Sequence, residues 1–224
     1  GAYLMRAKDP AKALFSANLM PSRGSWLELE VDKKGIVFAR IDRKRKLPVT
    51  VILRVLGYGR DHNILPADNT PEAEKRALDE RIEDERINGA QRILDLFDGS
   101  QFIANTLAKD TVTTMEEGLI ELFKKQRPGE PPTLENSRTL LRTLFFDPKR
   151  YDLTRVGRYK LNTRLSHDID GELRTLASPI FTGSMIHNDI TGWSDDSLGS
   201  TRLAEDLTGD RDDLVELLRK LIAL

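Results

Sequence analysis

The sequence predicts an α+β fold in which antiparallel strands with a hairpin come first, mostly helical segments follow, and a helical insertion separates two parts of the core. Apolar and polar residues alternate over residues 26–31, which is the period of a half-buried strand. From residue 70 onward, capping residues precede apolar positions at helical spacing. Cysteine is absent, so the fold must rest on a hydrophobic core without disulfides.

The predicted hairpin joins residues 26–31 to residues 36–41 through a turn at residues 32–35, where Gly35 can adopt a positive φ. Alternation divides the first strand into a core face with Leu27, Leu29 and Val31 and an opposite face with Trp26, Glu28 and Glu30. Residues 15–20 are predicted as a third strand. Residues 49–56 fit either a strand, from their β-branched start, or a helix, from the spacing of their apolar residues.

Residues 70–97 are predicted as a largely solvated helix or helical pair that stands off the main body. Thr70 suits the N-cap and Pro71 the first helical position. Eleven of the fifteen residues 72–86 are charged, so the apolar stripe is thin. Gly99 can end this segment.

Three further helices are predicted from their caps. Thr114 forms a capping box with Glu117, Thr133 caps a helix that ends before residue 147, and Asp210 caps the last helix. Residues 166–209 show weak periodicity and are predicted as a long loop or a loosely packed insertion. The chain is thereby divided into a first core part, a charged helical insertion, a second core part, the loop and a final helix: residues 1–65, 66–100, 101–165, 166–209 and 210–224.

Composition excludes several classes of function. Lysine plus arginine is 35 and aspartate plus glutamate is 36, for a net charge of -1, which excludes a uniformly basic nucleic-acid coat protein but not a local basic patch. The absence of cysteine excludes thiol nucleophiles and cysteine-ligated metals. The longest charge-free run, residues 175–188, is too short for a membrane span, so no membrane partner is expected. No signal peptide opens the sequence and both ends look cut, which suggests a piece of a larger protein.

No catalytic constellation is recognised. The three histidines, His62, His167 and His187, are far apart and have no carboxylate at ligand spacing. Gly57 and Gly59 lack the other residues of a phosphate-binding loop. The chain is therefore predicted to be inert on its own and to hold no cofactor.

Two clusters of positive charge remain as candidate binding surfaces. The first contains Arg40, Arg43, Lys44, Arg45 and Lys46, and the second contains Arg150, Arg155, Arg158, Lys160 and Arg164, interleaved with Tyr151 and Tyr159. Such clusters can face phosphates, although a solvated charged surface is the simpler explanation. Trp26, on the polar face of its strand, is either covered by another element or offered to a partner.

Four blocks of the sequence closely resemble the bacterial RNA polymerase β subunit, in the order in which they occur there. They are Pro-Ser-Arg-Gly-Ser-Trp-Leu-Glu at 21–28, Arg-Ile-Asp-Arg-Lys-Arg-Lys-Leu-Pro-Val-Thr at 40–50, Arg-Pro-Gly-Glu-Pro-Pro-Thr at 127–133, and the segment 144–162 that begins Leu-Phe-Phe-Asp-Pro-Lys-Arg-Tyr. They cover the lobe, or β2 domain. The resemblance is poor over 66–100, where the family has lineage-dependent insertions, and over 166–210.

This resemblance implies a fold and a cellular role. It favours a helix for residues 49–56 and places the domain in one pincer of the polymerase, beside the downstream DNA channel. The parent enzyme is a nucleotidyltransferase whose magnesium-binding aspartates lie on the other large subunit. The implied partners are DNA, the rest of β, the β′ subunit and a sigma factor, in the bacterial cytoplasm at the nucleoid.

The resemblance also implies a DNA-binding site. The residue that matches Trp26 stacks on an unpaired non-template base, and the one that matches Asp42 lies near the same pocket. With the neighbouring basic run, the expected DNA-binding residues are Trp26, Asp42, Arg43, Lys44, Arg45 and Lys46. The alternative is a purely structural or protein-docking domain. An exposed Trp26 beside the basic run favours DNA, whereas a buried Trp26 favours the structural alternative.

Overall fold

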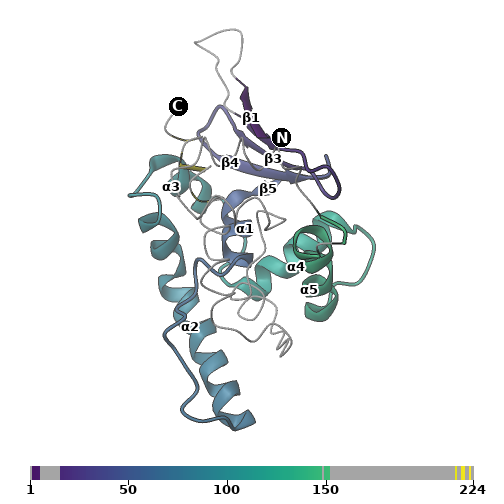
Figure 1. Cartoon of the computed structure of the whole chain (residues 1–224). Coiled ribbons are helices and arrows are strands. Elements are labelled where there is room, and N and C mark those ends of the chain that lie inside the picture. The colour runs from purple at the N-terminus through teal and green to yellow at the C-terminus, as the bar shows by residue number, and fades with distance from the viewer. Residues whose placement is uncertain are drawn as a thin grey trace, which may run out of the picture.

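The computed structural model describes residues 2–5, 16–147, 149–151, 215, 218, 219 and 222. Five antiparallel strands form one sheet in the order β1-β2-β3-β4-β5, comprising β1 (Ala2–Met5), β2 (Ser16–Leu19), β3 (Leu27–Val31), β4 (Val37–Ile41) and β5 (Leu47–Pro48). The helices that follow are α1 (Val49–Val55), α2 (Pro71–Asp95), α3 (Gln101–Leu107), α4 (Met115–Gln126), α5 (Leu134–Leu141) and a π-helix (Arg142–Phe146). The predicted α+β class is confirmed (Figure 1).

The central hairpin, β3 and β4, carries the predicted core face. Its cross-strand pairs on that face are Leu27 with Ile41, Leu29 with Ala39, and Val31 with Val37, and all six side chains are buried. The residues between them alternate toward solvent, as the period-two pattern requires. β2 confirms the predicted third strand, whereas β1, β5 and α3 were not predicted.

Helix α1 lies beneath the sheet in the centre of the fold (Figure 1), and all seven of its residues are buried. A helix enclosed on every side has no solvent-facing polar stripe. This explains why the hydrophobic pattern of residues 49–56 fitted both a strand and a helix. Its polar side chains are paired inside: the Arg54 Nε lies 3.4 Å from Asp110 Oδ2, and the Thr50 hydroxyl also bonds Asp110. The helix that the resemblance favoured is confirmed.

Helix α2 extends away from the sheet as a single long helix (Figure 1). It starts where predicted, because the Thr70 hydroxyl oxygen accepts a hydrogen bond from the Ala73 N–H at 3.3 Å. Its first half is mostly exposed, but Ile93 in its last turn and Phe97 just after it belong to the hydrophobic core. The segment is therefore not wholly detached from the body. The division of the chain into five parts stays a prediction.

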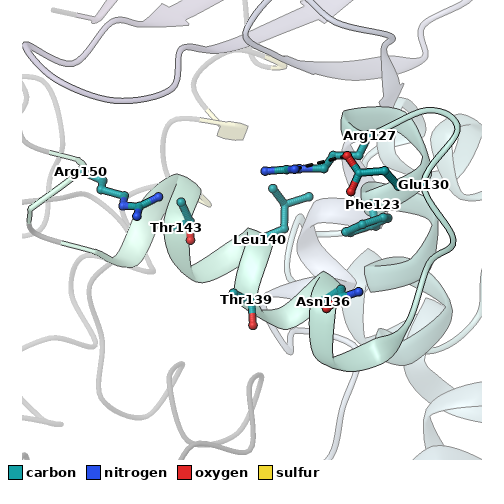
Figure 2. A pocket seen from close by; sticks show the side chains of 8 residues that line it. All are labelled: Phe123, Arg127, Glu130, Asn136, Thr139, Leu140, Thr143 and Arg150. Carbon is teal, nitrogen blue, oxygen red and sulfur yellow. Dashed lines mark hydrogen bonds and ion pairs between the residues drawn. The ribbon is translucent and has the colours of Figure 1, made fainter.

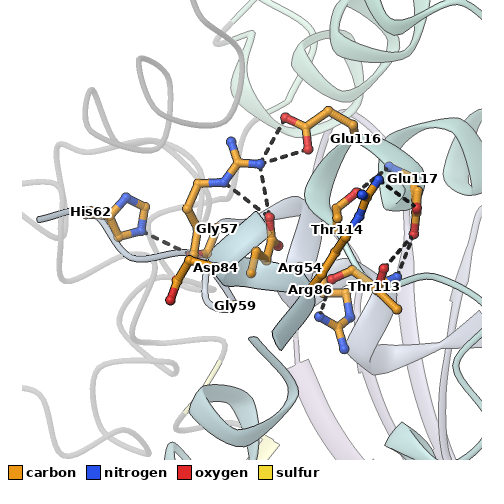
Figure 3. A network of polar contacts seen from close by, with 12 residues as sticks. Arg54, Gly57, Gly59, His62, Asp84, Arg86, Thr113, Thr114, Glu116 and Glu117 are labelled. Atoms are coloured by element: carbon orange, nitrogen blue, oxygen red, sulfur yellow. Dashed lines mark hydrogen bonds and ion pairs between the residues drawn. The ribbon is translucent and has the colours of Figure 1, made fainter. Parts of the chain in front are cut away.

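A buried ionic network fastens the middle of α2 to the body (Figure 3). The Arg60 Nη2 lies 3.0 Å from Glu85 Oε2 on α2 and 2.8 Å from Glu116 Oε2 on α4. Glu85 is fully buried. A Cβ on Gly89 would lie 3.0 Å from the Gly59 carbonyl oxygen, so α2 approaches this loop closely and a larger residue would require the loop to shift.

Burial raises the pKa of the Glu85 carboxyl, and the Arg60 guanidinium only partly offsets that effect. A raised pKa in the folded state means that folding takes up a proton, so stability from this group increases as pH falls toward the unfolded value of 4.5. As the pH falls from 7 to about 5, we expect the unfolding free energy of the parent chain to increase relative to that of Glu85→Gln. Urea titrations at several pH values measure it.

Asp84 is the control for that prediction because its shift has the opposite sign. The hydrogen bond from Arg92 lowers the pKa of Asp84 below 3.8, so its contribution is present above that pH and is lost below it. Asp84→Asn should therefore leave the pH dependence between 7 and 5 unchanged. The prediction for Glu85 is wrong if both variants follow the same curve.

The N-caps predicted for α4 and α5 are confirmed, but the predicted capping box is incomplete, because the Glu117 carboxylate accepts its 2.7 Å hydrogen bond from the Thr113 N–H, one residue before the cap. The Thr114 hydroxyl accepts from the Glu117 N–H at 3.3 Å, and the Thr133 hydroxyl accepts from the Asn136 N–H at 3.1 Å. The described residues of the last helix are 215, 218, 219 and 222, and Val215 and Leu218 are in the core. The predicted cap of that helix, at residue 210, and the predicted loop 166–209 lie outside the described residues.

Candidate nucleic-acid interface

The basic run begins in a tight turn after β4. Asp42 and Arg43 both have positive φ, 50° and 57°, and the Lys44 N–H donates to the Ile41 carbonyl at 3.0 Å. Positive φ at both central residues with this hydrogen bond is the pattern of a type I′ turn. Such a turn reverses the chain direction and matches the twist of the flanking antiparallel strands. Aspartate adopts this conformation readily and arginine rarely, so Arg43 holds a costly backbone geometry at the tip.

Reciprocal hydrogen bonds join this turn to Trp26. The Trp26 N–H donates to Asp42 Oδ1 at 2.8 Å, and the Asp42 N–H donates to the Trp26 carbonyl at 3.0 Å. They continue the pairing of Leu27 with Ile41 by one step beyond the strands. The structure thus brings Trp26 and Asp42 together, and one carboxylate oxygen of Asp42 serves to position the tryptophan backbone.

The Trp26 side chain is half-buried. It is therefore neither exposed, as expected for DNA binding, nor buried, as expected for a structural role. The Arg43 guanidinium carbon lies 4.7 Å from the centroid of its ring, a cation–π distance. Arg43 itself is 72% exposed, so it covers the indole without being enclosed. The pair presents an aromatic ring and a flexible cation at one point of the surface.

Acidic side chains neutralise part of the first basic cluster, which comprises Arg40 and the basic run at residues 43–46. The Lys46 Nζ lies 3.2 Å from Glu30 Oε1, and Arg40 lies 3.7 Å from Glu28 and 3.5 Å from Glu30. Arg43 reaches Glu28 only at 4.0 Å. These pairs are solvent-accessible, so each is weak, but they lower the local positive potential.

Lys44 is exposed, but its ammonium group is bound by the end of α4. Its Nζ donates to the Gln126 carbonyl at 2.9 Å, at the C-terminal end of α4, where a cation is favoured by the helix dipole. Arg45 is exposed and has no acidic partner among the described residues. Trp26, Asp42, Arg43 and Arg45 therefore form the candidate surface, which we call the Trp26 surface, while Lys44 and Lys46 are engaged within the domain.

The loop before Trp26 rests on the segment after the π-helix. Gly24 has a φ of 113°, and a Cβ there would lie 2.8 Å from both the Arg150 carbonyl oxygen and the Tyr151 ring. Two of the four blocks that carry the family resemblance thus meet in space. Tyr151 is fully buried and cannot stack on a ligand. Arg150 is exposed. The other charged members of the second basic cluster, and Tyr159, lie outside the described residues.

The other features considered in the sequence form no site in the described part of the chain. His62 bonds the Gly57 carbonyl through its Nε2 at 3.1 Å, while His167 and His187 are not described. No group of three or more potential ligands that could hold a metal occurs among the described residues. Within those same residues, none of the helices combines the length and apolar character that a membrane crossing requires.

Comparison with known proteins identifies the family. The family RNA polymerase Rpb2, domain 2, matches residues 1–190. The chain is 48% identical over 176 residues to a DNA-directed RNA polymerase subunit beta of Rubrobacter xylanophilus, which covers 79% of this chain and 13% of that protein. It is 50% identical over 167 residues to the subunit of Alkaliphilus oremlandii, with 74% of this chain and 11% of that protein covered. The chain therefore spans only about an eighth of these relatives, and it belongs to the Rpb2 domain 2 family, the lobe of the RNA polymerase β subunit.

Proposed function

We propose that this domain lines the downstream DNA channel of a DNA-directed RNA polymerase and contacts the non-template strand through the Trp26 surface. The observation that carries the proposal is the half-exposed Trp26 ring beside Arg43, held by the Asp42 turn. An aromatic ring offers stacking that any base can use. A flexible guanidinium adds attraction to phosphate that does not depend on sequence.

The geometry suggests how a base would be held. Arg43 covers part of the indole, so an unpaired base stacks on the ring in place of the guanidinium, which swings toward the adjacent phosphate. Because Asp42 fixes the tryptophan backbone, the ring needs little reorganisation. Arg45 supplies a second cation at the same edge.

The wider role of the parent protein is part of the same proposal. The relatives bear the name DNA-directed RNA polymerase subunit beta, so we infer that the whole subunit works in nucleotidyl transfer during transcription. The catalytic magnesium would then lie on another subunit. Partners would include the rest of β, β′ and a sigma factor, in the bacterial cytoplasm.

A structural or docking role is the second candidate. It is favoured by the engagement of Lys44 with α4 and of Lys46 with Glu30, which withdraws two of the four cations of the run from an external ligand. In that role, Trp26 would stabilise the hairpin end and its replacement would affect folding alone.

Trp26→Ala separates the two functions. In a polymerase assembled with the full-length subunit, we expect it to weaken the hold on the downstream bubble edge by about 1–3 kcal/mol. The loss should depend on the base at the stacking position. The lifetimes of open complexes on promoters varied at that base measure the effect.

Trp26→Phe is the matched control, because it keeps an aromatic face and should retain most of the lifetime. Melting of the 224-residue chain gives the second readout. A half-buried tryptophan should cost about 1–2 kcal/mol of stability when cut to alanine, between the values for surface and core positions. A larger melting shift, combined with lifetimes that do not vary with the base, would reject DNA contact in favour of the structural role.

A further inference from the structure

A second candidate site lies beside the C-terminal end of α4. A cavity of about 400 Å³ is bounded by the end of α4, the loop that follows it, α5 and the π-helix (Figure 2). Its volume lies within the range typical of small-molecule sites. It includes Arg150, the one described charged residue of the second basic cluster, which the proposed DNA contact does not use.

Two guanidinium groups approach the cavity from opposite ends. Figure 2 shows the side chains of Arg127 and Arg150 directed toward each other above the helix that carries Thr143. Each has only a weak partner: Arg127 lies 3.3 Å from Glu130, with both about half exposed, and Arg150 lies 3.4 Å from Asp147. Exposed pairs of this kind contribute little, so an incoming anion can replace them.

Neutral hydrogen-bonding groups also border the cavity, and in Figure 2 Thr143 is the one that lies between the two arginines. Asn136, Thr139 and Thr143 all border the cavity, and their spacing of three, four and seven places them on one helical face. The last of them lies in the π-helix, a widened turn that is frequent at functional sites. Phe123 and Leu140, which are both buried, form the apolar part of the cavity lining.

The geometry points to a binding site for a small phosphate-bearing molecule, with the phosphate held between Arg127 and Arg150. Arginine pairs with phosphate through two parallel N–H bonds, and the Thr143 hydroxyl, which borders the same cavity, can donate to a remaining oxygen. Phe123 and Leu140 would contact the organic part of a phosphate ester. The proposal is independent of the Trp26 surface, because none of its residues belongs to that surface.

The test is an NMR titration of the nitrogen-labelled 224-residue chain with inorganic phosphate, AMP and adenosine. We expect saturable shifts of the Arg127 and Arg150 side-chain signals with phosphate and AMP, and none with adenosine. Tighter binding of AMP would identify a phosphate ester as the ligand, and equal affinities would identify free phosphate. Absence of saturable shifts with both phosphate compounds would overturn the proposal.

Variants give the second arm of the test. Arg127→Met and Arg150→Met should each weaken binding about tenfold, because each removes a charge-assisted hydrogen bond. Glu130→Gln should strengthen binding about two- to fivefold, since it removes the carboxylate that competes for Arg127. Arg76→Met on α2, where the arginine is exposed, makes the same change in net charge. If it weakens binding as much as the pocket variants, the attraction is general and the site is rejected.

Discussion

Arg60→Met should lower the free energy of unfolding by about 3–5 kcal/mol, the cost of leaving buried charges without their partner. Arg60 and Glu85 are almost completely buried, with side chains 2% and 0% exposed, and Arg60 also neutralises Glu116. Methionine fills similar volume but leaves two carboxylates facing each other. Urea denaturation of the 224-residue chain at pH 7 measures the loss.

Arg86→Met provides the comparison, since it removes the same side chain from a solvent-exposed pair. Arg86 lies 3.7 Å from Glu83 and 3.9 Å from Glu117 and is about half exposed, so its loss should cost less than about 1 kcal/mol. If the two variants lose equal stability, the buried network does not hold α2 to the body. Partial recovery in Arg60→Met combined with Glu85→Gln would show that unpaired charge causes the loss.

This network shows where prediction from sequence reached its limit. Glu85 stands within the most charged stretch of the chain, and hydrophobic periodicity therefore assigned it to a solvated face. A charged residue buried against a partner leaves no apolar signature, and Arg60 is 25 positions away. The attachment of α2 could be found only from the fold. Ile93 and Phe97 are also buried, although this whole segment was predicted to stand off the main body.

The elements that sequence predicted well have one apolar and one polar face. The hairpin followed from strict alternation, and the helix starts followed from Thr70, Thr114 and Thr133, whose hydroxyls accept hydrogen bonds from the first turns. The missed strands β1 and β5 are short, and α3 has only seven residues. Short edge strands gain stability from the neighbouring strand more than from their own pattern.

In the candidate site, too, some features could be predicted from the sequence and others could not. The adjacency of Trp26 and Asp42 follows from the hairpin, because their neighbours Leu27 and Ile41 are directly paired. The direction of each cation could not be predicted, because it depends on distant groups. Lys44, for example, donates a hydrogen bond to the carbonyl of Gln126, which is 82 positions away in the sequence. Glu28 and Glu30 were placed on the Trp26 face by alternation, but their pairing with Arg40 and Lys46 required the register.

Gly24→Ala should destabilise the domain by about 2–5 kcal/mol, the combined cost of a strained backbone and of overpacking. At a φ of 113°, an added Cβ would lie 2.8 Å from the Arg150 carbonyl oxygen, and backbone atoms cannot move aside as a flexible side chain can. The loop must then lift from Tyr151 and carry Trp26 with it. Thermal and urea melts of the 224-residue chain measure the loss.

Gly129→Ala isolates the two contributions to that cost. Gly129 also has a positive φ, 93°, but no atom of the described residues lies within 4 Å of the position that an added Cβ would take, so it should show backbone strain alone, about 1–2 kcal/mol. The excess in Gly24→Ala then measures the contact between the Trp26 loop and the Arg150–Tyr151 segment. Equal losses would mean that this contact does not position Trp26. An excess together with shortened open complexes would show that DNA binding by Trp26 depends on support from residues more than a hundred positions away in the sequence.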